Sequence, residues 1–287
     1  MRFKLGAVEF TGETRNTPLM VREFTPGGAD LRDDDAELAQ RDGILPGADL
    51  LGGRMWAWDI SARGDNLTDV LQANAALEGA WRTPTRLQPG ANVPLSYMID
   101  GRWRRVYGRP RRYSGIVPDH IAIAGIGHIV CDFQVNDPLH YDEDETSVTL
   151  TIVPATTGGL EAPLAAPLST VRSSAPRAGL VTVTGDSPTP LKVTFHGPIS
   201  NPWVRSTAGM EVGITGSLAY DESITVDPLA GTVTRQDGAP ANGRLTRKTR
   251  LSNTRLQPGA TEFTFGGTDA TGTATATLSW RNAYYSI

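Results

Sequence analysis

Residues 54–60, Arg-Met-Trp-Ala-Trp-Asp-Ile, set two tryptophans and an isoleucine on one side of an extended chain. This alternation predicts a strand whose aromatic face packs on a core. A helix start signal follows at Gly64-Asp65-Asn66, and apolar residues then recur at near-helical spacing over 66–81. We therefore predict a strand followed by one amphipathic helix at the centre of the first half.

Further strands are expected on both sides of this pair. Val93–Ile99 and Arg102–Tyr113 predict a hairpin, because Asp100-Gly101 between them is typical of a two-residue turn. Arg2–Phe10 alternates loosely and is predicted as one strand. The segment 121–133 is apolar enough for a long buried strand or a pair of strands. With the helix, these strands make up a first domain.

The second half of the chain alternates more cleanly. Over 147–152, Val, Leu and Ile alternate with Ser and Thr, and the run 273–281 behaves in the same way. No window has a convincing helical period, so we predict an antiparallel β-sandwich of about 9–10 short strands. The chain is thus expected to be mainly β, with a one-helix domain at 1–141, a sandwich at 142–287 and an irregular connection at 155–179.

Two shorter segments are interpreted from their turn-forming and charged residues. The acidic stretch Asp30–Glu37 is expected to be a loop or a short helix. The C-terminal run Phe263–Ile287 contains a Gly/Thr/Asp turn between two alternating segments, so it is predicted as a hairpin that ends in an aromatic anchor.

Composition excludes several classes of function. The formal net charge of −4 argues against a protein that coats nucleic acid, which needs a basic surplus. Cys131 is the only cysteine, which excludes an intramolecular disulfide and a multi-cysteine metal site. The longest apolar run, 121–131, is far shorter than the ~20 residues of a membrane span, so no membrane insertion is expected. The first residues contain no secretory signal, so synthesis in the cytoplasm is expected.

Catalytic signatures are missing from the sequence. The four histidines have no metal-ligand spacing, and neither a P-loop nor a Gly-x-Ser-x-Gly motif occurs. We therefore expect no enzyme activity, no cofactor and no metal. One enzyme hypothesis stays open, a glycan hydrolase that uses paired carboxylates among Glu211, Asp221 and Glu222.

The predicted hairpin at 93–113 is rich in arginine interleaved with aromatic residues. It is a candidate contact surface for an acidic neighbour, such as 30–37 of another subunit, or for nucleic acid that passes nearby. A solvated strand face with arginine stems on aromatic rings is the alternative. The candidate subunit-interface residues are Arg102, Arg104, Arg105, Arg109, Arg111 and Arg112.

A second cluster suggests a sugar site. His196, Asn201, Trp203 and Arg205 lie close together in the predicted sandwich, where a tryptophan can stack on a sugar ring. Asn201-Pro202 is also an ordinary start of a turn, which is the simpler interpretation. The cluster keeps a carbohydrate-binding, receptor-recognising protein as an alternative function.

Several ordered segments together resemble a known family. The chain resembles the minor tail proteins of long-tailed bacteriophages of actinobacteria, of the distal tail protein type. The predominance of arginine over lysine, 24 against three, is typical of GC-rich genomes and fits such a host. The segments that carry the resemblance are Trp56-Ala-Trp-Asp-Ile60, Leu87-Gln-Pro-Gly-Ala91, Arg104-Arg-Val-Tyr-Gly-Arg-Pro-Arg-Arg112, Asp137-Pro-x-x-Tyr141, Gly197-Pro-Ile-Ser-Asn-Pro202, Ile224–Thr234 and Phe265–Trp280.

The resemblance implies a fold and an assembly. It implies a tail-tube-like N-terminal β domain with one helix, followed by a galectin-like β-sandwich. Six copies would form a ring between the tail tube and the distal tip or baseplate, around the channel that DNA crosses. The implied partners are other copies of the chain, the tail-tube protein, the tape-measure protein, and the tail-tip hub or other minor tail proteins. The implied location is the tail tip of the virion, with no sequence-specific nucleic-acid binding.

Overall fold

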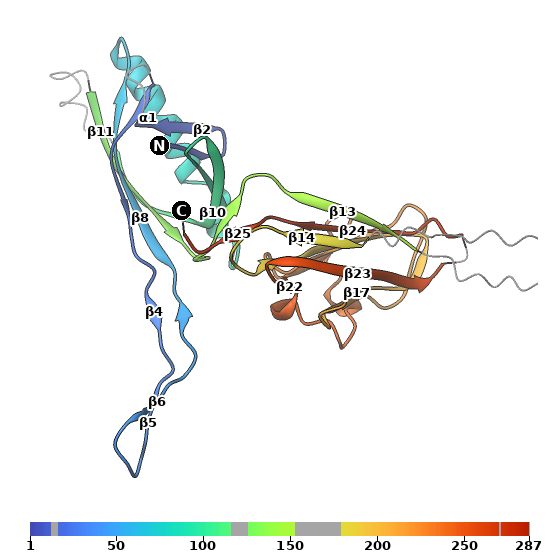
Figure 1. Ribbon diagram of the computed structural model, residues 1–287. Coiled ribbons are helices and arrows are strands. Elements are labelled where there is room, and N and C mark those ends of the chain that lie inside the picture. The colour runs from blue at the N-terminus through green and yellow to red at the C-terminus, as the bar shows by residue number, and fades with distance from the viewer. Residues whose placement is uncertain (13–16, 116–125, 153–178, 270, 287) are drawn as a thin grey trace, which may run out of the picture. The chain divides into compact units, whose positions relative to one another are not determined.

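The computed structural model describes residues 1–12, 17–115, 126–152, 179–269 and 271–286 (Figure 1). The chain forms two compact units, which we describe separately. Unit 1 comprises Met1–Glu143 and Tyr284–Ile287, and unit 2 comprises Asp144–Ala283. The expected mainly β fold class is confirmed, because α1 is the single α-helix among the described residues. Most of the predicted connection at 155–179 lies outside those residues.

Unit 1 is built on a nine-stranded sheet in the order β11-β8-β3-β2-β1-β9-β10-β12-β25. An additional pairing joins β10 to β11, so the sheet closes on itself. The strands are β1 (Arg2–Leu5), β2 (Val8–Thr11), β3 (Leu19–Pro26), β8 (Arg54–Arg63), β9 (Val93–Ile99), β10 (Arg102–Ser114), β11 (Ile126–Val135), β12 (His140–Asp142) and β25 (Ala283–Tyr284).

Turn geometry confirms one sequence prediction for this sheet and corrects another. Asp100 and Gly101 have φ of 49° and 72° in the two-residue turn between β9 and β10, as predicted. The prediction of one strand over 2–10 was wrong, because β1 and β2 pair as an antiparallel hairpin. Gly6 adopts φ 60° and lets the chain reverse there. The apolar residues Phe3, Leu5 and Phe10 of both strands are buried in one core, so the loose alternation alone did not reveal the break.

Helix α1 (Leu67–Trp81) begins where the sequence predicted. Asn66 caps it by accepting a hydrogen bond from the backbone N–H of Asp69 at 3.0 Å. The buried face of α1 consists of Val70, Ala73, Leu77 and Trp81, which pack with the tryptophans of β8 in one core. The indole N–H of Trp81 donates to a backbone carbonyl of β11 at 3.1 Å. A short 3₁₀ helix (Pro84–Leu87) follows.

A long ribbon, here called the arm, joins β3 to β8 and comprises residues 27–53. Its antiparallel pairs are β4 (Leu31–Arg32) with β7 (Leu50–Leu51), and β5 (Ala36–Glu37) with β6 (Ile44–Leu45). Figure 1 shows it extending away from the rest of unit 1. Gly47 lets its two sides approach, since a Cβ there would lie 2.0 Å from a backbone oxygen of the opposite side. The prediction of a loop or a short helix at 30–37 was therefore wrong.

Unit 2 is an antiparallel β-sandwich, as predicted. One sheet has the order β13-β24-β16-β20-β21, and the other has the order β14-β23-β17-β18 with β19 paired to β17. Phe195 of one sheet and Phe265 of the other meet in the shared core, with ring centroids 6.2 Å apart. The strands are β13 (Thr146–Thr151), β14 (Leu180–Val183), β16 (Lys192–His196), β17 (Ile199–Ser206), β18 (Glu211–Gly213), β19 (Ser217–Leu218), β20 (Ser223–Asp227), β21 (Thr232–Arg235), β23 (Gly259–Thr268) and β24 (Thr275–Trp280).

Smaller elements complete unit 2. They are the pair β15 (Thr189–Pro190) and β22 (Arg255–Leu256), and the 3₁₀ helices Asn242–Arg244 and Leu251–Asn253.

The C-terminal run is an arch between the sheets, so the predicted hairpin was wrong. β23 pairs with β14 and β17, whereas β24 pairs with β13 and β16 of the other sheet. Both strands alternate as expected, but their apolar faces meet across the core instead of side by side. Between the two strands, the side chain of Asp269 accepts hydrogen bonds from the backbone N–H groups of Thr271 and Ala274.

Candidate assembly interface

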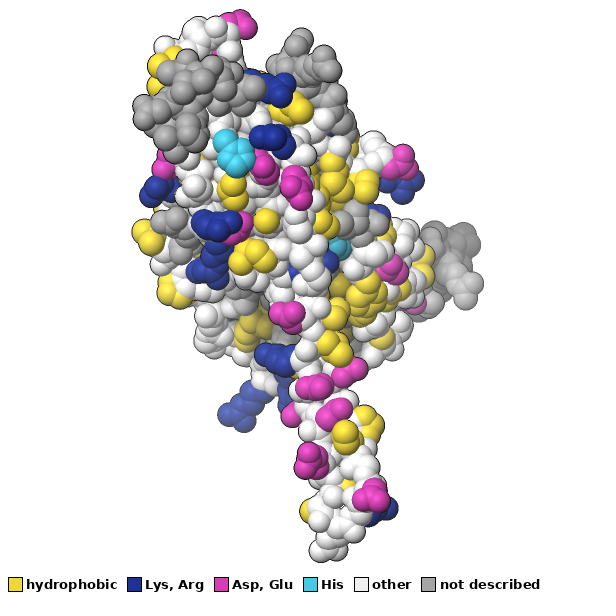
Figure 2. Space-filling model, turned by 90° about the vertical axis from the view of Figure 1, so that its left-hand side faces the viewer, with side chains coloured by type: hydrophobic (Ala, Val, Ile, Leu, Met, Phe, Trp, Pro, Cys, Tyr) yellow, Lys and Arg dark blue, Asp and Glu magenta, His cyan; other side chains and the backbone are white. Residues whose placement is uncertain are grey.

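The arm carries the largest group of unpartnered apolar side chains in the described part of unit 1. Twelve large apolar residues are exposed in the described residues of the chain, and five of them are in the arm. These five are between 47% and 62% exposed. They are Leu31, Ile44, Leu45, Leu50 and Leu51. Figure 2 shows the arm projecting from the molecule with yellow and magenta side chains along it. Isolated exposed apolar residues are ordinary, but a gathered set marks a surface that associates.

The arm is also strongly acidic. It contains seven aspartate or glutamate residues and two arginines, a net charge of −5, against −4 for the whole chain. The remainder of the protein therefore carries a net charge of +1. A partner surface for the arm must be apolar and must supply cations to offset these carboxylates.

The arginines of β10 are mostly engaged within their own chain. Arg105 forms a two-pronged contact with Glu143, with Nε–Oε2 and Nη2–Oε1 distances of 3.0 and 2.5 Å. Burial is the largest single influence on Arg105 and opposes its charge, but the hydrogen bonds and charges of Glu143 and Tyr107 together outweigh it and raise the pKa of Arg105. Arg104 lies 4.2 Å from the ring centroid of Tyr284 and donates to the carbonyl of Ser286.

The remaining arginines of this strand divide into two groups. Arg109 donates to the backbone carbonyls of Gln88 and Ala91, and thereby anchors the turn before β9. The pairing of β10 with β11 shifts register between Pro110 and Tyr113, which forms a bulge. The two residues within the bulge, Arg111 and Arg112, are exposed to solvent. One of them, Arg112, forms an ion pair with Asp132 at 3.1 Å, and its side chain is 64% exposed.

The six predicted interface arginines thus do not form one free cationic patch. Arg102 and Arg111 are exposed and make no ion pair with any described residue. Arg112 is partly available beside Arg111. A subunit contact through the arginine-rich strand stays a prediction, and the structure concentrates it on these three residues.

The four residues of the proposed sugar site lie on two different sheets. His196 ends β16, whereas the other three lie on β17 of the opposite sheet. The side-chain oxygen of Asn201 accepts a hydrogen bond from the backbone N–H of Gly216 at 2.9 Å, so it stabilises a turn. The Trp203 ring lies over Gly266, where a Cβ would come within 2.3 Å of it, and the Arg205 guanidinium carbon is 4.8 Å from its centroid. The tryptophan is therefore packed against its own sheet.

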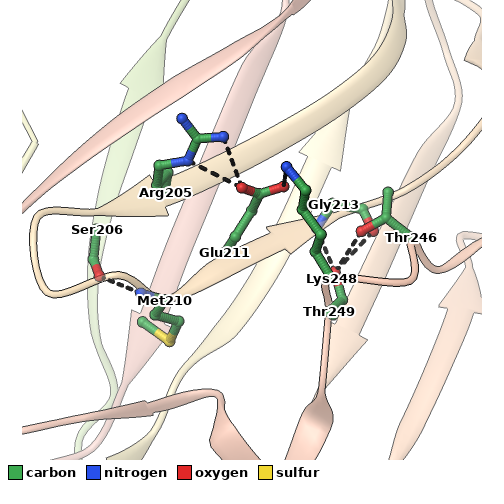
Figure 3. A network of polar contacts seen from close by, with 8 residues as sticks. All are labelled: Arg205, Ser206, Met210, Glu211, Gly213, Thr246, Lys248 and Thr249. Atoms are coloured by element: carbon green, nitrogen blue, oxygen red, sulfur yellow. Dashed lines mark hydrogen bonds and ion pairs between the residues drawn. The ribbon is translucent and has the colours of Figure 1, made fainter.

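Glu211 is the centre of a polar network on the same sheet (Figure 3). Its Oε2 accepts hydrogen bonds from Nε and Nη2 of Arg205 at 3.0 and 2.7 Å, and its Oε1 lies 3.7 Å from Nζ of Lys248. The hydrogen bonds from Arg205 are the main cause that lowers the pKa of Glu211. A carboxyl group held ionised in this way is poorly suited to act as a general acid. The network joins β17, β18 and the segment at 246–249.

The three carboxylates of the glycan-hydrolase hypothesis are divided between the two sheets of the sandwich. Glu211 lies on β18, whereas Asp221 and Glu222 are adjacent residues that precede β20 of the opposite sheet. Glu222 contacts Arg235 at 3.1 Å and accepts a hydrogen bond from the backbone N–H of Ala219. No group of three or more His, Cys, Asp or Glu side chains in the described ranges is arranged to hold a metal ion.

Sequence reasoning missed a buried polar cluster in unit 1. His140 is fully buried, its Nδ1 lies 2.6 Å from the hydroxyl of Tyr97, and Arg54 contacts its Nε2. Arg54 also donates to the carbonyl of Pro138 at 3.1 Å. Burial, followed by the charge of Arg54, lowers the pKa of His140 to about 3, and burial raises the pKa of Tyr97 to about 12. The histidine is therefore neutral and accepts from Arg54, so its Nδ1–H donates to Tyr97.

This cluster joins β8, β9 and β12, and both His140 and Tyr97 are buried within it. The sequence signal for it was the Asp137-Pro-x-x-Tyr141 motif, which contains His140. Asp137 accepts hydrogen bonds from the hydroxyl of Tyr141 at 2.7 Å and from the backbone N–H of Leu139 at 3.1 Å. The motif thus forms the corner that returns the chain to the sheet.

No helix in the described residues is both long and apolar enough to cross a membrane. We found no protein-family model and no curated sequence that matches the chain.

Solved structures from phage tails share the fold of the chain. The Dit protein of phage SPP1, presented as a paradigm of the hub adsorption apparatus of phages that infect Gram-positive bacteria, superposes with a TM-score of 0.57 and 16% identity, over 92% of this chain and 93% of that one. A chain of the phage P2 baseplate in its activated conformation with calcium gives a TM-score of 0.57 and 10% identity, over 95% and 93%. The corresponding structure with strontium gives 0.58 and 11%, over 92% and 91%. Over both of its units, this chain therefore has the fold of phage tail hub and baseplate proteins.

Proposed function

We propose that this chain is a structural protein of a bacteriophage tail tip, and that six copies form a ring that joins the tail tube to the distal tip or baseplate around the DNA channel. The fold shared with tail hub and baseplate chains over more than nine-tenths of the protein supports this role. The resemblance to tail proteins of actinobacterial phages, together with the 24 arginines against three lysines, supports an actinobacterial host. The protein would be made in the host cytoplasm and would act in the virion.

The observation that carries the proposal is the arm. A ring forms from a head-to-tail interface, which needs two different and complementary patches on one chain. The arm is one such patch, because it exposes five large apolar residues and carries a net charge of −5. The exposed arginines Arg102, Arg111 and Arg112 supply the opposite charge on the same unit. The arm of one copy would therefore contact unit 1 of the next.

The two halves of the chain have separate tasks in this proposal. The N-terminal domain at 1–141 forms the ring and contacts the tail-tube and tape-measure proteins. The C-terminal domain, predicted at 142–287 and built on the β-sandwich of unit 2, would contact the tail-tip hub or other minor tail proteins. The polar groups described above stabilise the fold, so the proposal requires no enzyme activity.

The mass of the purified native protein tests the proposal. A ring of six has a mass of six times 30.7 kDa, about 184 kDa, and light scattering after size exclusion separates it from the 30.7 kDa monomer. A variant in which residues 30–51 are replaced by a short Gly-Ser turn is expected to be a folded monomer. An intact protein that stays at 30.7 kDa at every concentration contradicts ring formation by this chain.

A further inference from the structure

The registers of the arm place apolar side chains on both of its faces. In a two-stranded ribbon, directly opposed residues share a face and neighbours along the strand lie on opposite faces. Leu31 is opposite Leu51, and Arg32 is opposite Leu50. One face of this pair therefore carries two leucines, and the other face carries a leucine and an arginine.

The same holds nearer the end of the arm. Ala36 is opposite Leu45, and Glu37 is opposite Ile44. The two large aliphatic side chains of β6 thus lie on opposite faces, and they are 60% and 62% exposed. Neither face is polar along the ribbon, and the described residues of unit 1 cover neither of them.

A ribbon that rests on a surface needs only one apolar face, because its other face stays in water. Polar side chains alternate with apolar ones in such a ribbon. The arm breaks this rule at two successive strand pairs, and aliphatic residues on both faces remain in contact with water in the single chain. Exposed aliphatic side chains that gather on a surface mark a site of association, and here they lie on both faces of the ribbon.

The charge of the arm indicates what covers it. Its net charge of −5 excludes an acidic surface as the partner, whereas the rest of this chain is slightly basic and presents Arg102 and Arg111 without ion pairs among the described residues. A second copy of the chain is therefore a complementary occupant.

We propose that the arm is enclosed on both faces when it associates with a second copy of this chain, instead of lying on that copy by one face. This inference rests on the proposed self-assembly and adds to it the manner of contact. The arm then inserts between surfaces of the second copy, and each of its two faces contributes to association.

Matched single substitutions separate the two faces. Leu31→Asp and Leu50→Asp place the same charge on opposite faces of one strand pair, and Leu45→Asp and Ile44→Asp repeat the comparison on the next pair. Leu180→Asp is the control, because Leu180 lies in unit 2 and its exposed fraction of 61% equals that of Leu31. Analytical ultracentrifugation over a concentration series measures association, and far-UV circular dichroism with thermal melting checks that each variant is folded.

Each arm variant is expected to weaken association at least tenfold, while Leu180→Asp leaves it unchanged. Loss confined to one member of each pair overturns the inference, because the other face is then free. Association unchanged in all four variants, with an intact wild-type ring, overturns the inference and leaves the proposed function standing. A wild-type protein that never associates overturns both.

Chemical labelling gives a second measurement that does not depend on disrupting the interface. Leu31→Cys and Leu50→Cys introduce one accessible thiol on each face, and the native Cys131 is fully buried and does not compete. Maleimide labelling of both positions is expected to slow at least tenfold in the assembled protein relative to the monomer. Protection at only one of the two positions overturns the inference.

Discussion

The packing of α1 on β8 gives a quantitative prediction from two identical substitutions in one helix. Leu77 is fully buried in the core of unit 1, whereas Leu67 of the same helix is 51% exposed. Replacing a buried leucine by alanine removes its burial and leaves a cavity, at a cost of about 2–5 kcal/mol. We expect a loss of about 3 kcal/mol in the free energy of unfolding of unit 1 for Leu77→Ala. Leu67→Ala is expected to change it by less than about 0.5 kcal/mol.

Hydrogen exchange of the β8 amides measures this difference within unit 1, because β8 lies under the helix and pairs with β3 and β11. A loss of about 3 kcal/mol accelerates exchange through global opening by roughly 150-fold, since each 1.4 kcal/mol is a factor of ten. Leu77→Met keeps most of the volume and is expected to cost less than about 1.5 kcal/mol. Equal effects of the two alanine substitutions would refute the assigned buried face of the helix.

Three further predictions follow from the polar contacts and the packing. The folded-state pKa of His140 is about 3, below its usual 6.5, so the stability of unit 1 is fully present above pH 6.5 and declines as the pH falls. Chemical denaturation should show that this residue lowers the free energy of unfolding by about 2 kcal/mol between pH 7 and 5. This loss should be absent in His140→Asn. The same pH dependence of the free energy of unfolding in both proteins would refute the prediction. Arg105→Glu should place two carboxylates face to face, which costs about 2 kcal/mol in the free energy of unfolding and lowers the melting temperature of unit 1. Arg111→Glu should leave the melting temperature unchanged but weaken association at low salt. Gly266→Ala should displace the Trp203 ring and cost about 1–3 kcal/mol, and unchanged tryptophan fluorescence in a mutant of normal stability would contradict that contact.

Local patterns predicted the elements whose stability depends on nearest neighbours. The alternation at 54–60, the cap at Asn66 and the Asp100-Gly101 turn each act within a few residues, and β8, α1 and the β9–β10 hairpin formed as expected. The sandwich of unit 2 was predicted for the same reason, because its strands alternate in the simple manner of a half-buried sheet.

The alternation of apolar and polar residues did not reveal which strands pair with one another. The run Phe263–Ile287 was predicted as a hairpin, but its two strands pair within different sheets. Either arrangement buries the same apolar residues, so alternation could not distinguish them. The arm was missed because its pairs are only two residues long, and its many carboxylates resemble those of a solvated loop. Fewer arginines of the candidate interface are exposed than the sequence predicted, because Arg105 and Arg109 bind groups 38 and 18 residues away in the sequence. Short-range patterns do not reveal such partners.

By itself, the sequence determined the mainly β class, the single helix of the described chain, and the absence of a recognisable catalytic motif. These properties depend on composition and short-range periodicity, which the order of residues expresses directly. Only the tertiary structure decided which arginines remain exposed, how His140 is held neutral, and that an acidic ribbon presents aliphatic residues on both faces. Such properties depend on strand register and on contacts between distant segments, because a shift of one residue in pairing moves every side chain of a strand to the other face.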